Sequence, residues 1–331
     1  MSWNILNLAP TFRDAGPAGR EMLEAAGCTV VETQRVCPLT ASDLLTDLPG
    51  IAAVVAGADE YSSDVLTTPE TSGLKMVQRW GVGYDAVDID AATAAGIVVG
   101  YLPGFLDDTV ADYTWALLLS IARRIPWGQD TMRAGDWHVT WGHDVVERTL
   151  GIVGCGRIGT AVAERAKGFR MRLLGFDPFP NEAARAAGVE FVSMEQLLEQ
   201  SDFICLNAAA TPENRGLIGE PELRQMKPSA YLINTARGAL LDEAAMVKAL
   251  NEEWISGAAL DCFSEEPLPA DHPLRTAPNA ILCPHMAPYV WGNVREMNRA
   301  AAQNILDLLN GRRPEFIVNP EVFDSPQLRV L

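Results

Sequence analysis

Short apolar runs alternate with helical patterns along almost the whole chain, and this alternation is what most constrains the fold. Most of the runs are not interrupted by polar residues, which is typical of strands that are buried on both faces. Such strands, separated by helices, predict an α/β fold with parallel sheets covered on both sides. The runs include 51–56, 76–80, 150–153, 172–176, 203–206, 231–234 and 280–283, and the helices include 161–168, 194–200, 243–251 and 294–311.

A glycine-rich motif follows one of these runs, in the segment TLGIVGCGRIG. Gly154 permits a tight turn, Gly156 lets the backbone approach a pyrophosphate, and Gly159 lets helix and strand pack closely. The N-terminus of the following Ala-rich helix offers unpaired N–H groups and a favourable dipole to the phosphates. Asp177 ends the next apolar run, 18 residues after Gly159. A carboxylate there accepts ribose hydroxyls and repels a 2′-phosphate, which predicts NAD as the cofactor in preference to NADP.

A chain of 331 residues is too long for one ordinary core and predicts two domains. A boundary is expected near 103–104, before a long apolar-periodic helix over 109–125, with Asp107 or Asp108 as its N-cap and Pro126 as its end. We expect two Rossmann-like domains with doubly wound parallel sheets, linked by two long crossing helices. The predicted domains are an NAD-binding domain over 105–291 and a flavodoxin-like, substrate-binding domain over 1–104 plus 292–331.

Three charged residues stand at the ends of apolar segments downstream, namely Arg237, Glu266 and His285. Ligands of an open α/β sheet bind beyond the carboxyl ends of its strands, so these side chains can converge. Imidazole can accept the hydroxyl proton when a secondary alcohol loses hydride, and can return it in the reduction. A neighbouring carboxylate stabilises the imidazolium, and a guanidinium holds a substrate carboxylate and polarises the C2 oxygen. The remaining histidines are predicted to lie in loops: His138, His143 and His272.

Composition excludes several other classes of function. The formal charge of −17 argues against binding to nucleic acid or to an anionic membrane. No apolar run approaches the ~20 residues of a membrane span, and the N-terminus lacks the pattern of a secretory signal. The six cysteines are scattered without a C-x-x-C pair, which favours free buried thiols in a reducing cytoplasm over a zinc site or disulfides. We therefore expect a cytoplasmic protein without a metal.

From about Leu74 to Arg299 the sequence resembles the D-isomer-specific 2-hydroxyacid dehydrogenase family. The resemblance rests on long motifs in the family's order, at 79–85, 149–159, 226–238, 258–269 and 284–285. It implies an NAD-dependent oxidoreductase that moves a hydride between nicotinamide and C2 of a D-2-hydroxy acid or 2-oxo acid. Arg237 would anchor the substrate carboxylate, and Glu266 would support His285 as the acid and base.

The same resemblance assigns further contacts. The backbone N–H groups of Val82 and Gly83 would take the substrate carboxylate, Asp261 would accept from the nicotinamide carboxamide, and two chains would pair through the long helix after Pro103. The expected cofactor-binding residues are Gly154, Gly156, Arg157, Ile158, Gly159, Asp177, Thr235, Ala236, Asp261 and His285. The expected substrate-binding residues are Val82, Gly83, Tyr101, Arg237 and His285.

Departures from the family pattern concern the substrate rather than the catalytic groups. Tyr101 lies in a segment that replaces the family's common Asn, Asn207 replaces its usual His, Cys262 replaces its usual Val, and 286–289 departs from the usual sequence after His285. Aromatic residues near the inferred site favour a 2-oxo acid with a small or apolar side chain over a phosphorylated one. They are Trp80, Tyr101, Trp137, Trp141, Tyr289 and Trp291, with Met286 beside them.

Three alternatives stay open at this point. Trp141 either packs in a dimer interface or closes the partner's substrate pocket. One branch of the fold consists of NAD-binding corepressors, which are interaction proteins that keep the same charged triad. Another branch oxidises formate or phosphite.

Overall fold

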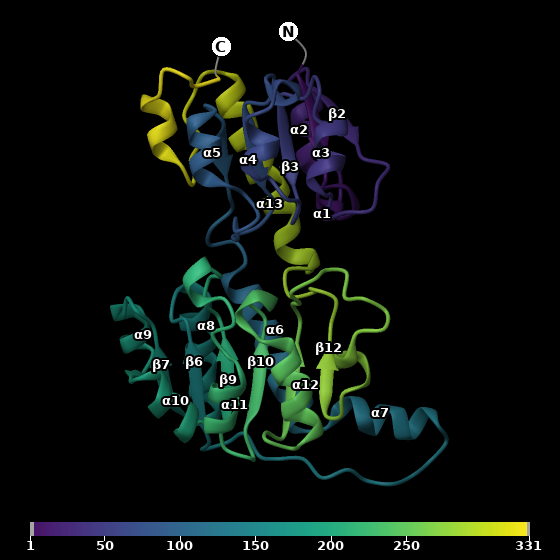
Figure 1. The fold of residues 1–331 in the computed structure, drawn as a ribbon, viewed down its shortest axis with the longest axis vertical. Helices are drawn as coiled ribbons and strands as arrows, with labels where there is room; N and C mark the ends of the chain where they lie inside the picture. Colours follow the sequence, from purple (N-terminus) through teal and green to yellow (C-terminus); the bar gives the residue numbers. More distant parts are fainter. Residues whose placement is uncertain (1–2, 330–331) are drawn as a thin grey trace. The chain divides into compact units, whose positions relative to one another are not determined.

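The computed structural model describes residues 3–329, which form two parallel sheets, one of five strands and one of seven (Figure 1). The sheets belong to two compact units. One comprises the residues up to Leu106 and those from Tyr289 onward, and the other comprises Asp107–Pro288. The predicted α/β class is confirmed. Among the described residues no helix is both long and apolar enough to cross a membrane.

The larger sheet lies in the unit Asp107–Pro288, and its strand order is β12-β11-β10-β9-β6-β7-β8. Its strands are β6 (Thr149–Val153), β7 (Arg172–Phe176), β8 (Val189–Phe191), β9 (Phe203–Leu206), β10 (Tyr231–Asn234), β11 (Gly257–Leu260) and β12 (Ala280–Leu282). Its helices are α6 (Asp107–Ala122), α7 (Ile125–Arg133), α8 (Arg157–Ala166), α9 (Glu182–Ala186), α10 (Met194–Gln200), α11 (Glu220–Gln225) and α12 (Glu243–Asn251).

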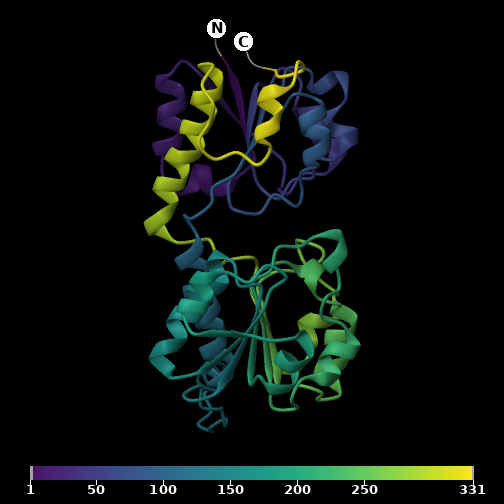
Figure 2. The same cartoon turned by 90° about the vertical axis from the view of Figure 1, so that its left-hand side faces the viewer.

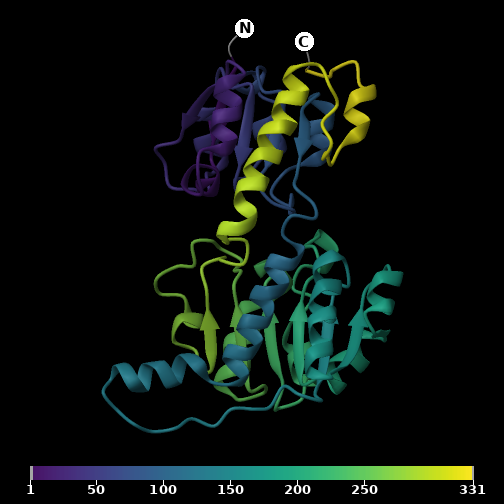
Figure 3. The ribbon, with the colours of Figure 1, turned by 180° about the vertical axis from the view of Figure 1, so that it is seen from behind.

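Both faces of this sheet are buried, which explains why its central strands are apolar at almost every position. In β9, Phe203 and Cys205 pack into one core with Trp115 of α6, whereas Ile204 and Leu206 face the opposite core. Successive side chains of a strand point to opposite faces, so a strand between two cores has no polar alternation. Helices α10, α11 and α12 cover one face (Figure 1), and α6 covers the other (Figure 3). Figure 2 shows the sheet nearly edge-on between the two layers.

The order of the strands fixes where a ligand can bind. From β6 the chain runs outward through β7 to β8, and then returns to form β9 on the other side of β6. The connections leaving β6 and β9 therefore diverge, and ligands of open α/β sheets bind beyond the carboxyl ends of strands at such a point. The glycine motif follows β6, and Asn207 follows β9.

The smaller sheet has the order β2-β1-β3-β4-β5, and all its pairings are parallel. One of its faces packs on α3, α4 and α5, and α13 packs on α2 and β4. The strands are β1 (Asn4–Asn7), β2 (Thr29–Glu32), β3 (Ala53–Ala56), β4 (Met76–Arg79) and β5 (Val98–Gly100). The helices are α1 (Pro10–Asp14), α2 (Ala18–Ala25), α3 (Ala41–Asp47), α4 (Ser63–Leu66), α5 (Ile89–Ala94) and α13 (Trp291–Leu309).

The predicted long helix over 109–125 is wrong at both ends. It begins at Asp107, so Asp107 and Asp108 lie in its first turn, where carboxylates favour the helix dipole. It ends at Ala122 because Arg124 adopts a left-handed conformation with φ 57°. Pro126 does not end this helix but starts α7, since the first turn of a helix tolerates a residue without an N–H group.

Candidate active site

The glycine loop between β6 and α8 is shaped by contacts that only glycine allows. Gly154 has φ +89°, and a Cβ on it would lie 2.4 Å from the backbone nitrogen of Ala208. A Cβ on Gly159 would lie 2.1 Å from the carbonyl oxygen of Gly154. Gly156 is the N-cap of α8, and no atom of the described residues lies within 4 Å of the position of its missing Cβ. The loop therefore presents open space and a helix N-terminus together, as a pyrophosphate requires.

Asp177 lies against this loop, immediately after β7. Its carboxylate accepts hydrogen bonds from the backbone N–H groups of Cys155 and Phe179, both at 2.8 Å. The side chain of Arg157 forms an ion pair with Asp107 of α6 at 3.5 Å. The group that Arg157 offers to a phosphate at the start of α8 is therefore its backbone N–H. A hollow of about 450 Å³ opens beside the loop, lined by Asp107, Asp108, Gly156, Arg157, Thr160, Ala161, Glu164, Asn181 and Ala183. This donor set and the space beside it fit a dinucleotide with free ribose hydroxyls.

Asn207 is a candidate that the sequence showed only as a departure from the family pattern. Its side-chain oxygen and nitrogen are both buried, and neither has a hydrogen-bond partner among the described residues. Its backbone carbonyl carbon lies 2.7 Å from where a Cβ of Gly154 would be. A buried, unpaired amide costs free energy, so a polar partner is expected at this end of β9. A bound cofactor beside the glycine loop would supply one.

The three predicted catalytic residues follow three neighbouring strands. Arg237 comes after β10, Glu266 after β11 and His285 after β12, and these strands are paired in parallel in that order. Their carboxyl ends therefore share one edge of the sheet. Glu266 accepts a hydrogen bond from Nδ1 of His285 at 2.8 Å, and its other oxygen accepts from the backbone N–H of Phe263 at 2.9 Å. The structure thus brings the predicted carboxylate and imidazole into contact.

Electrostatics keep this pair ionised. Burial alone would raise the pKa of Glu266, but the hydrogen bond from His285 and the charges of His285 and Arg237 outweigh it, and the pKa is lowered. Burial alone would lower the pKa of His285, but hydrogen bonds with Cys262 and Glu266 outweigh it, and the pKa is raised. The charged carboxylate of Glu266 stabilises the protonated form of the His285 imidazole. Such a group can give a proton to a reacting oxygen.

The backbone before Arg237 is fixed by Asn234, the last residue of β10, which is fully buried. Its side chain accepts from the N–H of Ala236 at 3.0 Å and donates to the carbonyl oxygen of Arg237 at 2.9 Å. The hydroxyl groups of Thr235 and Thr114 lie 2.7 Å apart, which ties the same turn to α6. Sequence reasoning missed Asn234, although a polar residue in a buried strand was a signal for it.

Asp261 follows β11 and is fully buried. Its two carboxylate oxygens accept from the backbone N–H groups of Met286 and Ala287, at 2.8 and 2.9 Å, and its carbonyl oxygen accepts from the N–H of His285 at 2.8 Å. Burial raises the pKa of Asp261, although those two N–H groups oppose it. His285 has φ 53°, which a non-glycine residue adopts only when its surroundings impose it. Asp261 therefore clamps the loop that carries His285.

The predicted substrate residues Val82, Gly83 and Tyr101 belong to the other unit. The loop after β4 is shaped by Arg79, which donates to the carbonyl oxygens of Gly83 and Ala56, both at 2.9 Å. The rings of Tyr101 and Tyr84 meet edge to face, with centroids 5.8 Å apart.

Several predicted pocket aromatics do not share one environment. Trp80 is buried in the unit of the smaller sheet, and its indole N–H donates to Asn298 of α13 at 2.7 Å. Trp137, Trp141 and Trp291 are exposed. Trp80 and Trp291 belong to one unit and Trp137 and Trp141 to the other, so a shared pocket wall stays a prediction.

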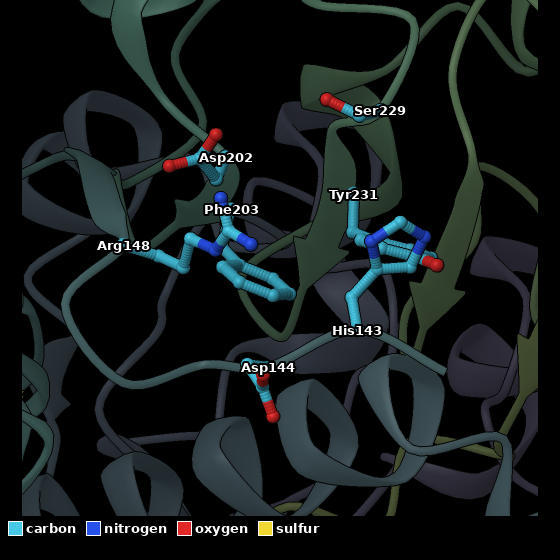
Figure 4. A pocket seen from close by; sticks show the side chains of 7 residues that line it. All are labelled: His143, Asp144, Arg148, Asp202, Phe203, Ser229 and Tyr231. Atoms are coloured by element: carbon cyan, nitrogen blue, oxygen red, sulfur yellow. The ribbon is translucent and has the colours of Figure 1, made fainter. Parts of the chain in front are cut away.

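A small cavity of about 60 Å³ lies at the opposite, amino-terminal edge of the larger sheet. Figure 4 shows the ring of His143 beside Tyr231, and their centroids are 5.7 Å apart. The cavity is lined by His143, Asp144, Arg148, Asp202, Phe203, Ser229 and Tyr231. It is too small for a dinucleotide, and the predicted site residues do not line it. His272 caps a short turn and pairs with Glu243 at 3.3 Å, away from His285.

Comparison with known proteins decides between the families that this geometry allows. Residues 115–287 match the family model described as the D-isomer specific 2-hydroxyacid dehydrogenase, NAD binding domain. A glyoxylate reductase of Korarchaeum cryptofilum is 45% identical over 256 residues, which cover 75% of this chain and 77% of that protein. A glyoxylate reductase of Thermofilum pendens is 37% identical and covers 92% of both chains. The chain belongs to the D-isomer specific 2-hydroxyacid dehydrogenase family.

A solved structure extends the likeness to the whole fold. The D-lactate dehydrogenase of Aquifex aeolicus, in complex with NAD and lactic acid, superposes with a TM-score of 0.83 at 25% identity, over 96% of this chain and 99% of that one. This chain is therefore an NAD-dependent oxidoreductase that transfers a hydride between nicotinamide and C2 of a D-2-hydroxy acid or 2-oxo acid. The corepressor and the formate or phosphite alternatives are not favoured.

Proposed function

We propose that the chain reduces a small 2-oxo acid, with glyoxylate as the first candidate, and that Arg237, Glu266 and His285 carry the reaction. The contact of 2.8 Å between Glu266 and His285, at the strand ends beside Arg237, is the observation on which this proposal depends. The names of the two relatives, both glyoxylate reductases, support the choice of substrate. A small substrate also agrees with the apolar and aromatic residues expected around it.

In this mechanism NADH supplies the hydride that C2 receives. The guanidinium of Arg237 binds the substrate carboxylate and polarises the C2 carbonyl oxygen. His285 donates its proton to that oxygen as the bond order falls, and Glu266 holds the ring in place and stabilises its charge. The glycine loop, Asp177 and the backbone at Thr235 and Ala236 hold the cofactor. The backbone N–H groups of Val82 and Gly83 take part in binding the carboxylate.

The test is a panel of 2-oxo acids of increasing size, assayed with NADH through the nicotinamide absorbance. We expect glyoxylate, or another 2-oxo acid with a short side chain, to have the highest kcat/KM. Preference for a branched or phosphorylated substrate would contradict the assignment of glyoxylate but leave the reaction class intact. Formate or phosphite oxidation without reduction of any 2-oxo acid would contradict the proposed roles of the catalytic residues.

We also propose a homodimer that pairs through α7 and the segment after it, residues 125–148, here called the α7 arm. Figure 3 shows α7 and this segment extending from the rest of their own unit. Within the described chain α7 has no buried residue, and apolar side chains of the arm are exposed. They are Ile125, Met132, Trp137, Val139 and Trp141. Exposed apolar surface of this kind is typical of an interface, and a second copy of the chain would cover it.

A further inference from the structure

A thiol lies beside the predicted catalytic pair, at a position that the family usually fills with Val. Cys262 is the second residue after β11, and Glu266 and His285 follow the carboxyl ends of β11 and β12. One ligand atom from each of the three residues, a sulfur, a carboxylate oxygen and a ring nitrogen, lies within 4.8 Å of the other two. Cys262 is 2% exposed, and its sulfur lies 3.4 Å from the carbonyl oxygen of Ala236.

This set of donors matches a particular class of cation. Thiolate, imidazole and carboxylate are the ligands of Zn²⁺ and of related borderline-soft ions, whereas Ca²⁺ and Mg²⁺ prefer oxygen alone. Three protein ligands with an open fourth position are typical of reactive zinc sites. Val in place of Cys262 would leave only two ligands, so the third donor distinguishes this chain from the family pattern.

The spacing requires local adjustment, because the three ligand atoms lie within 4.8 Å of one another, whereas the ligands of a bound ion lie closer together. Ligands of a tetrahedral zinc, with bonds of about 2.0 Å, lie about 3.3 Å apart. Glu266 and His285 are 2.8 Å apart, so their hydrogen bond must open by about half an ångström for both to bind one ion. Both side chains are partly exposed, at 26% and 36%, which leaves room for that movement.

We propose that Cys262, Glu266 and His285 form a binding site for one Zn²⁺-class ion, and that the bound ion inhibits the enzyme. The thiol of Cys262 and the imidazolium of His285 each release one proton to solvent, and the thiolate sulfur, the neutral ring nitrogen and the carboxylate oxygen donate electron pairs to the metal. The ion then replaces the contact between Glu266 and His285 that proton transfer needs. The inhibitory part rests on the proposed function, whereas binding does not. Sequence reasoning expected a free buried thiol and no metal, so this role of Cys262 comes from the structure alone.

The experiment measures binding and inhibition separately. The metal-free full-length protein is titrated with Cd²⁺, whose bond to a thiolate gives an ultraviolet charge-transfer band. The wild-type chain is expected to show this band, saturating at one ion per chain, and to lose NADH-dependent activity when Zn²⁺ is added over a similar range. A wild-type protein without the band, or with a band that never saturates, would overturn the site.

Matched variants identify the ligand. Cys262→Val restores the family residue, and Cys262→Ser keeps the size and polarity but provides a poor ligand for either ion. Because the loss of a second-shell partner alone weakens metal binding by about 10–100-fold, the loss of this ligand should raise the inhibitory Zn²⁺ concentration by at least about 100-fold. Cys283→Val removes a neighbouring thiol outside the cluster and should leave band and inhibition unchanged. Inhibition is expressed relative to the basal rate of each variant.

Two results would overturn the proposal and differ in what else they contradict. A band that persists in both folded Cys262 variants would show that another thiol binds the metal, and would leave the proposed function intact. A stoichiometric band in the wild type with full activity would overturn the inhibitory part, and would also count against His285 as the acid and base. Loss of the band in both variants, with circular dichroism as in the wild type, supports the site.

Discussion

His285 and His272 offer a direct comparison at the scale of single residues, because each pairs with a glutamate in the same unit. His285 contacts Glu266 at 2.8 Å at the carboxyl ends of the strands, and His272 contacts Glu243 at 3.3 Å in a surface turn. We predict that His285→Gln lowers kcat by roughly 10²–10⁴-fold, the usual contribution of a general acid and base. His272→Gln should change kcat little. Steady-state kinetics of both variants provide the test, and near-normal turnover in His285→Gln would refute the proposed mechanism.

Asp177 carries the prediction about the cofactor. Its carboxylate is held by two backbone N–H groups, so its charge sits at a fixed place beside the glycine loop. A 2′-phosphate near that charge is repelled, which makes NADH the preferred cofactor. Asp177→Asn keeps the size and one acceptor oxygen, and should raise the ratio of kcat/KM for NADPH to that for NADH by roughly 10–100-fold. Asp202→Asn, a carboxylate at the opposite edge of the sheet, serves as the control. Equal use of both cofactors by the wild type would contradict the prediction.

At the scale of elements, the turn from β6 into α8 depends on the absence of side chains. A Cβ on Gly159 would approach the carbonyl oxygen of Gly154 to 2.1 Å, and this oxygen belongs to backbone that cannot swing aside. We predict that Gly159→Ala destabilises the protein by about 1–3 kcal/mol and weakens NADH binding, since the loop must move. Gly168→Ala is the matched control, because no described atom lies within 4 Å of its missing Cβ. Thermal unfolding and fluorescence titration with NADH measure both effects.

The loop after β12 makes a second prediction at this scale. Asp261 accepts two of the loop's N–H groups, and Asn in its place would offer one oxygen and turn an NH₂ group toward the other donor. We expect Asp261→Asn to lower kcat by about 10–100-fold while changing the Kd of NADH by less, because the loop that carries His285 loses its left-handed conformation. If Asp261 served mainly the nicotinamide carboxamide, the Kd of NADH would rise instead. Comparison of kcat with the Kd from a direct titration separates these outcomes.

The pattern of elements was predictable, whereas the contacts that hold the site were not. Apolar runs predicted β7, β9 and β10 with their observed bounds, because a strand between two cores carries few polar residues. Charged residues at the strand ends predicted that Arg237, Glu266 and His285 would meet. The hydrogen bonds from the loop of His285 to Asp261, and the lack of a partner for the buried amide of Asn207, depend on residues distant in sequence. The break at Arg124, which separates α6 from α7, has no cue in local helix propensity.

At the scale of the whole molecule, net charge and site chemistry act in opposite directions. A formal charge of −17 repels an anionic 2-oxo acid at long range, yet binding is decided by the few groups at the site. Arg237 and the N-terminus of α8 offer positive potential within one edge of a sheet. Salt screens the long-range repulsion more than these close contacts. Binding of the substrate therefore depends on the groups that surround it at the site. In the proposed homodimer, these groups can include residues of the second copy of the chain.

Trp141 is the residue at which assembly and substrate choice meet. Its side chain is 90% exposed in the single chain, and Trp137 in the same arm is 86% exposed. Aromatic residues that become buried on association contribute much of the affinity of an interface. We therefore predict that Trp137→Ala and Trp141→Ala each shift the dimer toward monomer in sedimentation experiments. Trp254→Ala, a tryptophan outside the arm that stacks on Arg224, should leave the dimer intact.

The two roles of Trp141 predict different kinetics. If this side chain closes the substrate pocket of the partner, Trp141→Ala should raise kcat/KM for larger 2-oxo acids relative to glyoxylate, whereas Trp137→Ala should not change that ratio. If it only packs in the interface, both variants should lose activity in proportion to the loss of dimer, and the size preference should stay as in the wild type. Assays at a protein concentration that keeps each variant dimeric remove the effect of dissociation. The ratio between substrates then reports the pocket alone, and an unchanged ratio in Trp141→Ala would assign this tryptophan to interface packing.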